Sequence, residues 1–271
     1  MYAEDYVKQY HNITVPEFFS SDGAYNFYGT LATSTPVREY SNSKYTSRLG
    51  ATYKERCDLK DLLLYNFLPK RAKDPKSGIE KVGSSYRLMS SWAPIDELPA
   101  SHYQRAVGGK ASPSVLRKFI QFFNYWRCYR VRVEGKEVKS IAYLVAQYLG
   151  ADCNGFVGNY LAEEFPELDV NPNNPEESYL TKAKKKGGVI RKAIDEIDCD
   201  DIVVFHGHIG IISRVLTRAG KSANVVFCES RTRHQVYGGP QSNILELEQT
   251  SKGFKLQGRE AVLDIVRIPG M

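Results

Sequence analysis

One cysteine of this chain stands where its chemistry can be used. Cys153 follows Asp152 and precedes Asn154 and Gly155, at the point where a run with helical spacing begins. If Asp152 caps that helix, Cys153 lies in the first turn, where free backbone N–H groups and the positive end of the helix dipole stabilise a thiolate. The same N–H groups can hold the oxyanion of a tetrahedral intermediate, and Gly155 lets a substrate backbone come close. These residues therefore suit a nucleophile for acyl transfer.

A structural role is the ordinary alternative for this cysteine. Cys153 is in phase with Phe156, Val157 and Tyr160 on one helical face, and cysteine is among the residues most often buried. A nucleophilic role needs a base beside the thiol and a third group that orients the base.

Polar residues that interrupt apolar strands supply candidates for both partners. His206 and His208 stand in a strongly apolar segment, and Glu229 interrupts the apolar segment that follows. A buried imidazole or carboxylate must find a hydrogen-bond partner or lower the stability of the fold. A cysteine at a helix start, a histidine on a strand and a polar residue on the neighbouring strand form a nucleophile, a base and an orienting group. The sequence therefore predicts catalysis by Cys153, one of these histidines and Glu229, with no cofactor.

Two other kinds of site fit some of the same residues. His206 and His208 face the same side of a regular strand, and Cys228 or His234 can complete a tetrahedral metal site with them. That reading leaves the residues around Cys153 unexplained, and His234 is more typical of a surface loop. A binding module with the same shape and no chemistry is the other alternative.

Helical patterns precede and follow the cysteine. Ser112 as N-cap with Pro113 at the first helical position predicts the start of one helix. The helix that starts after Asp152 is expected to end before Pro166. The periodicity of apolar residues predicts two more helices, at residues 57–68 and 137–150.

Strand patterns dominate the last third of the chain. They predict strands at residues 201–213, 223–230 and 261–268, and a hairpin region after residues 237–243. Helices followed by an antiparallel sheet define an α+β fold class.

The segment 106–114, which contains two glycines and a helix start, is the best candidate for a domain boundary. We therefore expect an N-terminal region of unknown fold at 1–108 and a second domain at 109–271, which carries Cys153, the two histidines and Glu229. Residues 166–188 combine turn residues with a lysine run and are predicted to form a solvated insertion.

The composition is that of an ordinary folded protein. The 271 residues are 42% hydrophobic and 25% charged, enough for one large domain or two modest ones. The formal net charge of +6 suits an anionic partner such as a cell-wall polymer, but it is spread over many segments, and we expect no nucleic-acid partner. The five cysteines are widely and irregularly spaced, which argues against a disulfide framework and predicts at least one free thiol. No signal peptide and no run of ~18 apolar residues is recognised, so no membrane insertion is expected.

The residues that suggest chemistry also resemble a known family. The segment "DCNGFV" is similar to the Asp-Cys-Ser-Gly-Phe/Leu-Val motif of NlpC-type cell-wall cysteine peptidases and the related CHAP amidases. The segment "DDIVVFHGHIGII" resembles their Gly-Asp-Ile-Val-Phe and His-Val-Gly-Ile-Tyr segments, which aligns His208 with the family's base and leaves His206 outside the motif. Glu229 matches the third polar position. The resemblance covers residues 137–230, with Asn154 in place of the usual serine and Asp200 in place of the usual glycine.

The resemblance implies a papain-like fold, with helices packed on an antiparallel sheet, and a thioester mechanism on Cys153, His208 and Glu229. It implies that residues 109–271 form a cysteine hydrolase domain that cleaves amide bonds in the stem peptides of bacterial peptidoglycan, with wall binding or delivery as candidate roles for residues 1–108. Without a recognised signal peptide, we expect a protein made in the cytoplasm and delivered to the periplasm or cell wall of a target bacterium, as an antibacterial effector or a lysin. An inhibitor protein that gives immunity is the expected partner. A cysteine protease or deamidase acting on proteins is the alternative.

Overall fold

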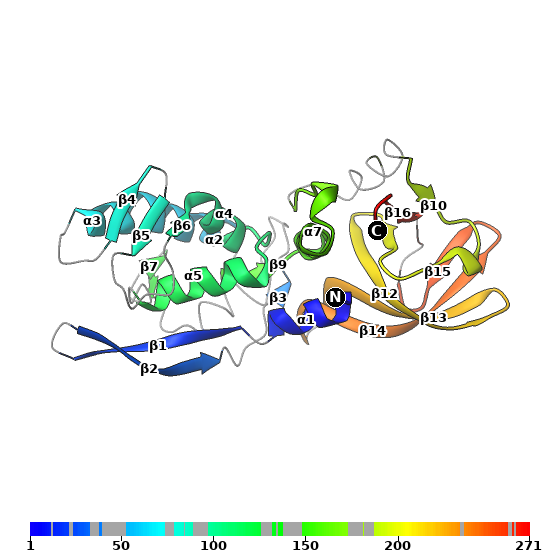
Figure 1. Cartoon of the computed structure of the whole chain (residues 1–271), viewed down its shortest axis with the longest axis horizontal. Helices are drawn as coiled ribbons and strands as arrows, with labels where there is room; N and C mark the ends of the chain where they lie inside the picture. Colours follow the sequence, from blue (N-terminus) through cyan, green and yellow to red (C-terminus); the bar gives the residue numbers. More distant parts are fainter. Residues whose placement is uncertain are drawn as a thin grey trace. The chain divides into compact units, whose positions relative to one another are not determined.

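The computed structural model of the chain describes residues 1–11, 13–21, 24–32, 38–39, 53–73, 79–83, 85–88, 97–125, 132–133, 135–137, 148–172, 181, 187–233, 236–259, 262 and 264–271. The chain divides into two compact units. Met1–Gln9 and Asp152–Met271 form one, here called the sheet unit, and Tyr10–Ala151 forms the other, here called the helical unit. Both contain helices and antiparallel strands, so the α+β class predicted from the sequence is confirmed (Figure 1).

This division differs from the boundary that the sequence suggested near residue 108. The helices α4 (Ala100–Val107) and α5 (Pro113–Tyr125) lie on either side of that position and pack together. The Tyr103 ring lies 5.5 Å from the Phe119 ring and 5.9 Å from the Phe122 ring, centroid to centroid. The glycines at 108 and 109 therefore form a turn inside the helical unit, and the units divide between Ala151 and Asp152.

Helices and short strands alternate in the helical unit. One continuous helical segment combines α2 (Tyr53–Asp61), a π-helical stretch (Leu62–Phe67) and α3 (Leu68–Ala72), and it includes the helix expected at 57–68. The strands pair as β1 (Thr14–Ser21) with β2 (Ala24–Ala32), β3 (Arg38–Glu39) with β9 (Gly150–Ala151), β4 (Ile79–Val82) with β5 (Ser85–Leu88) and β6 (Glu97–Pro99), and β7 (Arg132–Val133) with β8 (Lys136–Glu137).

Local signals placed the start of α5 correctly. The Ser112 side-chain oxygen accepts a hydrogen bond from the Val115 N–H at 3.3 Å, and Pro113 is the first helical residue. The helix predicted at 137–150 falls largely on residues 138–147, which lie outside the described residues.

A seven-stranded antiparallel sheet forms most of the sheet unit. Its spatial order is β10 (Val189–Ile190), β16 (Asp264–Arg267), β11 (Ile202–Phe205), β12 (His208–Ala219), β13 (Ser222–Arg233), β14 (Val236–Thr250) and β15 (Gly253–Leu256). The register between β12 and β13 shifts at two places, and such bulges bend a sheet. Figure 1 shows the long strands curving, and apolar side chains from β11, β12, β13 and β16 fill one hydrophobic core.

The helices α1 (Ala3–His11) and α7 (Cys153–Glu164) supply the helical part of this unit. Tyr6 of α1 is fully buried, and its ring lies 6.1 Å from the Phe156 ring and 5.7 Å from the Tyr160 ring of α7. The Glu4 N–H donates to the Ser213 hydroxyl at 3.2 Å. The first residues of the chain are therefore part of the same core as the last 120.

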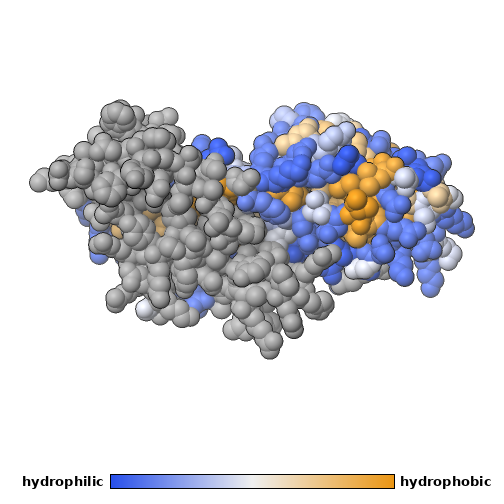
Figure 2. Space-filling model, turned by 90° about the horizontal axis from the view of Figure 1, so that it is seen from below, coloured by the Kyte–Doolittle hydropathy of each residue, from blue (hydrophilic) through white to orange (hydrophobic). Residues whose placement is uncertain are grey.

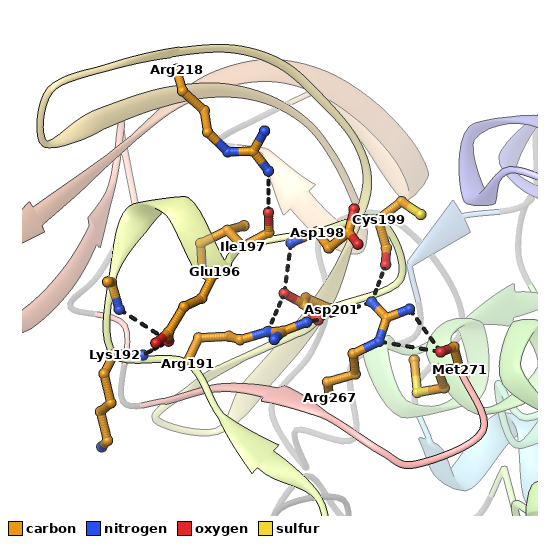
Figure 3. A network of polar contacts seen from close by, with 11 residues as sticks. Arg191, Lys192, Glu196, Ile197, Asp198, Cys199, Asp201, Arg218, Arg267 and Met271 are labelled. Carbon is orange, nitrogen blue, oxygen red and sulfur yellow. Dashed lines mark hydrogen bonds and ion pairs between the residues drawn. The ribbon is translucent and has the colours of Figure 1, made fainter.

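A buried carboxylate ties three segments of the sheet unit together. Asp201 is fully buried just before β11, and it accepts hydrogen bonds from Arg191 at 2.9 and 3.0 Å and from the Asp198 N–H at 2.8 Å (Figure 3). Arg267 of β16 lies 3.4 Å from the same carboxylate and donates to the Cys199 carbonyl at 2.7 Å. This network fixes the start of β11 against β16 and the segment after β10.

The predicted insertion at 166–188 is described only in part. It begins with a 3-10 turn (Pro166–Leu168), and Leu168 and Val170 are buried. Its first residues thus pack against the fold rather than extend into solvent.

Figure 2 shows one face of the molecule, on which most of the coloured surface is hydrophilic and an apolar patch is exposed.

Candidate active site

The N-terminus of α7 presents Cys153. Asp152 has an extended backbone and caps the helix, because its side-chain oxygen accepts the Gly155 N–H at 2.5 Å and its carbonyl oxygen accepts the Phe156 N–H at 2.9 Å. Cys153 is the first helical residue and is half-buried. The helix predicted after Asp152 is confirmed. Its apolar residues Phe156, Val157, Tyr160 and Leu161 are fully buried, whereas Phe165, which the same pattern places on the inward face, is only half-buried.

The backbone N–H groups of the first turn of α7 differ in whether they already have a hydrogen-bond acceptor. Because the Gly155 N–H is engaged by Asp152, it is not free to hold an oxyanion. Within the described part of the chain, the Cys153 N–H has no acceptor, and it is the amide closest in sequence to the thiol. Asp152 thus shapes the helix start, while Asn154 is buried in the same turn.

A tight hairpin presents His208. Residues 201–213 were expected to form one strand, but β11 ends at Phe205 and β12 begins at His208, with these two residues paired across a two-residue turn. Gly207 has a φ of 71°, a conformation that glycine adopts at little cost. His208 is the first residue of β12, and its ring lies 5.8 Å from the Phe205 ring.

This turn removes the basis for the histidine metal site. His206 lies in the turn and is exposed, whereas His208 starts the next strand and is largely buried, so the two rings do not share the face of one regular strand. Among the described residues, no group of three or more His, Cys, Asp and Glu side chains is arranged to hold a metal ion. His234, one of the two residues suggested to complete that site, lies outside the described residues.

The neighbouring strand β13 carries Glu229. Gly210 of β12 pairs with Glu229, so His208 is the diagonal neighbour of the carboxylate on the same face of the sheet. The His208 Nε2 and Glu229 Oε2 atoms are 2.9 Å apart, and the Glu229 side chain is fully buried.

The pairing depends on a glycine at position 210. A Cβ atom there would lie 2.2 Å from the Phe227 ring and 2.8 Å from the Cys228 carbonyl oxygen. Phe227 therefore fills the place where another residue would have a side chain, and β12 and β13 keep the spacing that lets Glu229 reach His208.

The thiol completes the arrangement. The Cys153 thiol lies close enough to His208 for hydrogen bonding between them to help raise the pKa of the ring, and the Nε2 atom of the ring lies 2.9 Å from Glu229 Oε2. Burial of the ring opposes its charged form. The hydrogen bonds and the negative charges of Cys153 and Glu229 outweigh burial, and they raise the pKa of His208 to about 9. The structure thus brings together the three residues predicted to be catalytic.

An arginine that sequence reasoning missed completes the surroundings of Glu229. Arg259, in the turn after β15, donates from Nε to Glu229 Oε1 at 2.9 Å, and its Nη2 contacts the same oxygen. Burial of Glu229 opposes its charged form, but the hydrogen bonds from His208 and Arg259 outweigh burial, and the pKa of Glu229 is lowered. The two carboxylate oxygens are therefore divided between a histidine and an arginine.

Asp200 departs from the glycine of the resembled family in a position where glycine has a physical purpose. Its φ is 67°, in the left-handed region that glycine favours and aspartate tolerates. Its carboxylate accepts the Tyr160 hydroxyl at 2.7 Å, which ties the segment before β11 to α7.

The other described cysteines differ from Cys153 in their surroundings. Cys57, Cys199 and Cys228 are also free thiols, and Cys128 lies outside the described residues. Burial is the main cause that raises the pKa of the Cys199 and Cys228 thiols, and no histidine contributes. Cys153 is thus the one among these four whose thiol interacts with an imidazole.

Comparisons with protein-family models, with curated proteins and with solved structures find no match to this chain. In the part of the chain that the structure describes, no helix is both long enough and apolar enough to cross a membrane.

Proposed function

We propose that this protein is a cysteine hydrolase that cleaves amide bonds through a thioester on Cys153. The placement of Cys153 beside His208, which is itself hydrogen-bonded to Glu229, is the observation that carries the proposal. It joins a half-buried thiol at a helix N-terminus, an imidazole with a raised pKa and a buried carboxylate, which are the three parts of a nucleophilic triad.

In the first half of the reaction, the Cys153 sulfur attacks the amide carbonyl carbon and the carbonyl electron pair moves to oxygen. The Cys153 N–H is placed to donate to that oxyanion. His208 then gives its proton to the amide nitrogen, the C–N bond breaks, and an amine leaves while the acyl group stays on sulfur.

In the second half, neutral His208 takes a proton from water and the oxygen attacks the thioester carbon. The C–S bond breaks, the acid is released and the thiolate returns beside the protonated ring. Glu229 orients the ring through Nε2 and stabilises its charged form during both halves.

Peptidoglycan stem peptides are the substrate class that we infer. The motif around Cys153 and the segments that carry His208 and Glu229 resemble those of NlpC-type peptidases, whose fold is papain-like. The order of a helix-borne cysteine, a strand histidine and a polar residue on the next strand agrees with that resemblance. The net charge of +6 favours contact with an anionic wall. On this proposal the protein acts in the periplasm or wall of a target bacterium, and an inhibitor protein protects the producer.

Purified sacculi incubated with the protein provide the test, with released fragments identified by mass spectrometry. The wild-type protein should release peptide fragments, and Cys153→Ala should release none while keeping its circular dichroism spectrum. Cys199→Ala is the matched control, because it removes another half-buried thiol of the same unit, and it should retain activity.

Hydrolysis by Cys153→Ala at the wild-type rate would overturn the mechanism. Cys153-dependent cleavage of proteins or glutamine side chains, with intact sacculi, would instead reject the cell-wall substrate and keep the mechanism.

A further inference from the structure

In the described part of the chain, Arg259 is a charged residue outside the triad that contacts it directly, through Glu229. Its side chain is 8% exposed and that of Glu229 is 0% exposed, so water screens the pair very little. Nε and Nη2 of the guanidinium both point at Oε1, while Oε2 faces His208. The arginine also donates from Nη1 to the Gly258 carbonyl at 3.1 Å, which fixes the guanidinium within its own turn.

We propose that Arg259 is a positioning residue for catalysis, which keeps Glu229 ionised and turned toward His208. This inference rests on the proposed function, because it assigns a role within the same triad. The four groups alternate in charge when the site is ready to react: guanidinium, carboxylate, imidazolium and thiolate.

The alternation has a physical consequence. A carboxylate with no exposure to water and no cation gains a proton or leaves its site, because burying an uncompensated charge is costly. A protonated Glu229 would stabilise the imidazolium less, and the imidazolium in turn stabilises the thiolate. Arg259 therefore acts on the sulfur through two intervening groups.

The geometry adds orientation to charge. Two donors on one oxygen restrict the carboxylate plane, and only arginine offers two N–H groups in a rigid fork. The second oxygen is then presented to Nε2 of His208 at 2.9 Å.

The structure shows which titratable groups lie next to His208 and Glu229, the two middle members of the series from Arg259 to Cys153. Cys153 of α7 and Glu229 of β13 face His208, and His208 and Arg259 face Glu229. Cys228, next to Glu229 on β13, is fully buried, and burial, with the Glu229 charge as a smaller cause, raises the pKa of its thiol and favours the neutral form.

The pH dependence of Cys153 alkylation tests the inference without a substrate. Iodoacetamide reacts with the thiolate, and peptide mass spectrometry reads each cysteine separately. In Arg259→Met, the inflection of the Cys153 rate should move up by about one pH unit, because a cation that favours the charged chain is lost. In Arg259→Lys, which keeps the charge but not the fork, the inflection should lie closer to that of the wild type. Cys199, in the same unit, is the internal control and should keep its profile.

A double substitution shows whether Arg259 acts through Glu229. Once Glu229→Gln has removed the carboxylate, adding Arg259→Met should shift the Cys153 profile no further. The double variant buries no unpaired charge, so it remains informative if Arg259→Met alone fails to fold.

Three results would overturn the inference. The pH profile of Cys153 alkylation in Arg259→Met could coincide with that of the wild type, or Arg259→Lys and Arg259→Met could shift it equally. In the Glu229→Gln background, adding Arg259→Met could shift the profile as much as it does in the wild type. Each outcome is separable from failure of the proposed function, because alkylation reports on the thiol whether or not a hydrolysed substrate is found. A wild-type protein that releases nothing from sacculi leaves this measurement intact.

Discussion

Two fully buried carboxylates of the sheet unit solve the same electrostatic problem with different partners. Among the described residues, the Asp201 carboxylate accepts from groups whose charge or dipole is permanent, namely Arg191, Arg267 and the Asp198 N–H (Figure 3). Glu229 gives one oxygen to Arg259 and the other to His208.

The difference lies in whether a partner can change its charge. Arginine stays protonated at every pH relevant to a folded protein, so the Asp201 network has a single electrostatic state. Histidine can lose its proton within the pH range of a folded protein, and His208 does so at a pKa of about 9, so the Glu229 network has one state with a charged ring and one with a neutral ring. Burial alone therefore does not identify a catalytic carboxylate, whereas a titratable partner beside a nucleophile does.

Isosteric neutralisation of each carboxylate gives the largest contrast. Glu229→Gln should lower kcat/KM on the order of 10²–10⁴-fold, because the imidazolium loses its negative partner. Asp201→Asn, the matched change, should leave kcat/KM of the folded protein within about threefold, since its side chain contacts Arg191, Arg267 and the Asp198 N–H and none of the triad residues. Steady-state kinetics at a pH where both variants are folded distinguish the two. Comparable losses in both variants would show that the second network also serves the reaction.

Truncation of the Asp201 side chain should lower the stability of the protein and not its activity. Asp201→Ala leaves Arg191 and Arg267 without their shared anion, and removing one partner of a buried ion pair costs about 3–5 kcal/mol. The lower end is expected here, because both guanidinium groups retain some exposure. Urea unfolding measures the loss. Asp195→Ala, at an exposed position of the same unit, should stay within about 0.5 kcal/mol of the wild type. A loss below about 1 kcal/mol for Asp201→Ala would show that the network is dispensable.

Some parts of the fold and the site could be predicted from the sequence, and others could not. The start of α7 and the start of α5 were predictable, because Asp152, Ser112 and Pro113 act on residues three or four positions away. The triad was predictable because a histidine and a glutamate in apolar strands are conspicuous. The role of Arg259 was not predictable, because Arg259 lies in a turn without periodicity and its partner Glu229 is 30 positions earlier in the chain.

Two other outcomes of the sequence analysis have equally specific causes. The run 201–213 is apolar on both sides of a two-residue turn, so it looked like one strand, although Gly207 carries the signal of a hairpin. The glycines near 108 suggested a boundary because loop composition is visible in sequence. The packing of Tyr6 against Phe156 and Tyr160, which places the first residues in the sheet unit, is visible only in three dimensions.

The pH dependence of stability provides a third contrast. The pKa of His208 is raised from 6.5 to about 9, so its contribution is complete below pH 6.5 and is lost as the pH rises through about 9. Each pH unit within that window changes the free energy of unfolding by up to about 1.4 kcal/mol, for about 3 kcal/mol in all. The lowered pKa of Glu229 acts in the opposite direction, with a contribution that is present above pH 4.5 and lost on acidification.

Urea unfolding of the wild type and of His208→Gln, from pH 6 to 9.5, measures the histidine's contribution. The decline that the wild type shows between about pH 6.5 and 9 should be much smaller in the variant. His206→Gln is the control two residues away, in the exposed turn, and should follow the wild type. A parallel decline in wild type and His208→Gln would show that the ring gains little from Cys153 and Glu229.

An exposed ion pair of the same unit should give the smallest effect and calibrate the other three. Glu4 of α1 lies 2.7 Å from Arg214 of β12, a contact as short as those of the buried carboxylates, but the arginine side chain is 45% exposed. Water and salt screen such a pair, and side-chain ordering offsets part of its attraction, so Glu4→Gln should cost about 0.2–1 kcal/mol. Urea unfolding at low salt and at about 1 M NaCl tests this, because the cost should shrink at high salt while that of Asp201→Ala persists. If Glu4→Gln costs as much as Asp201→Ala, contact distance rather than burial sets the strength of these pairs, and the contrast between exposed and buried carboxylates no longer holds.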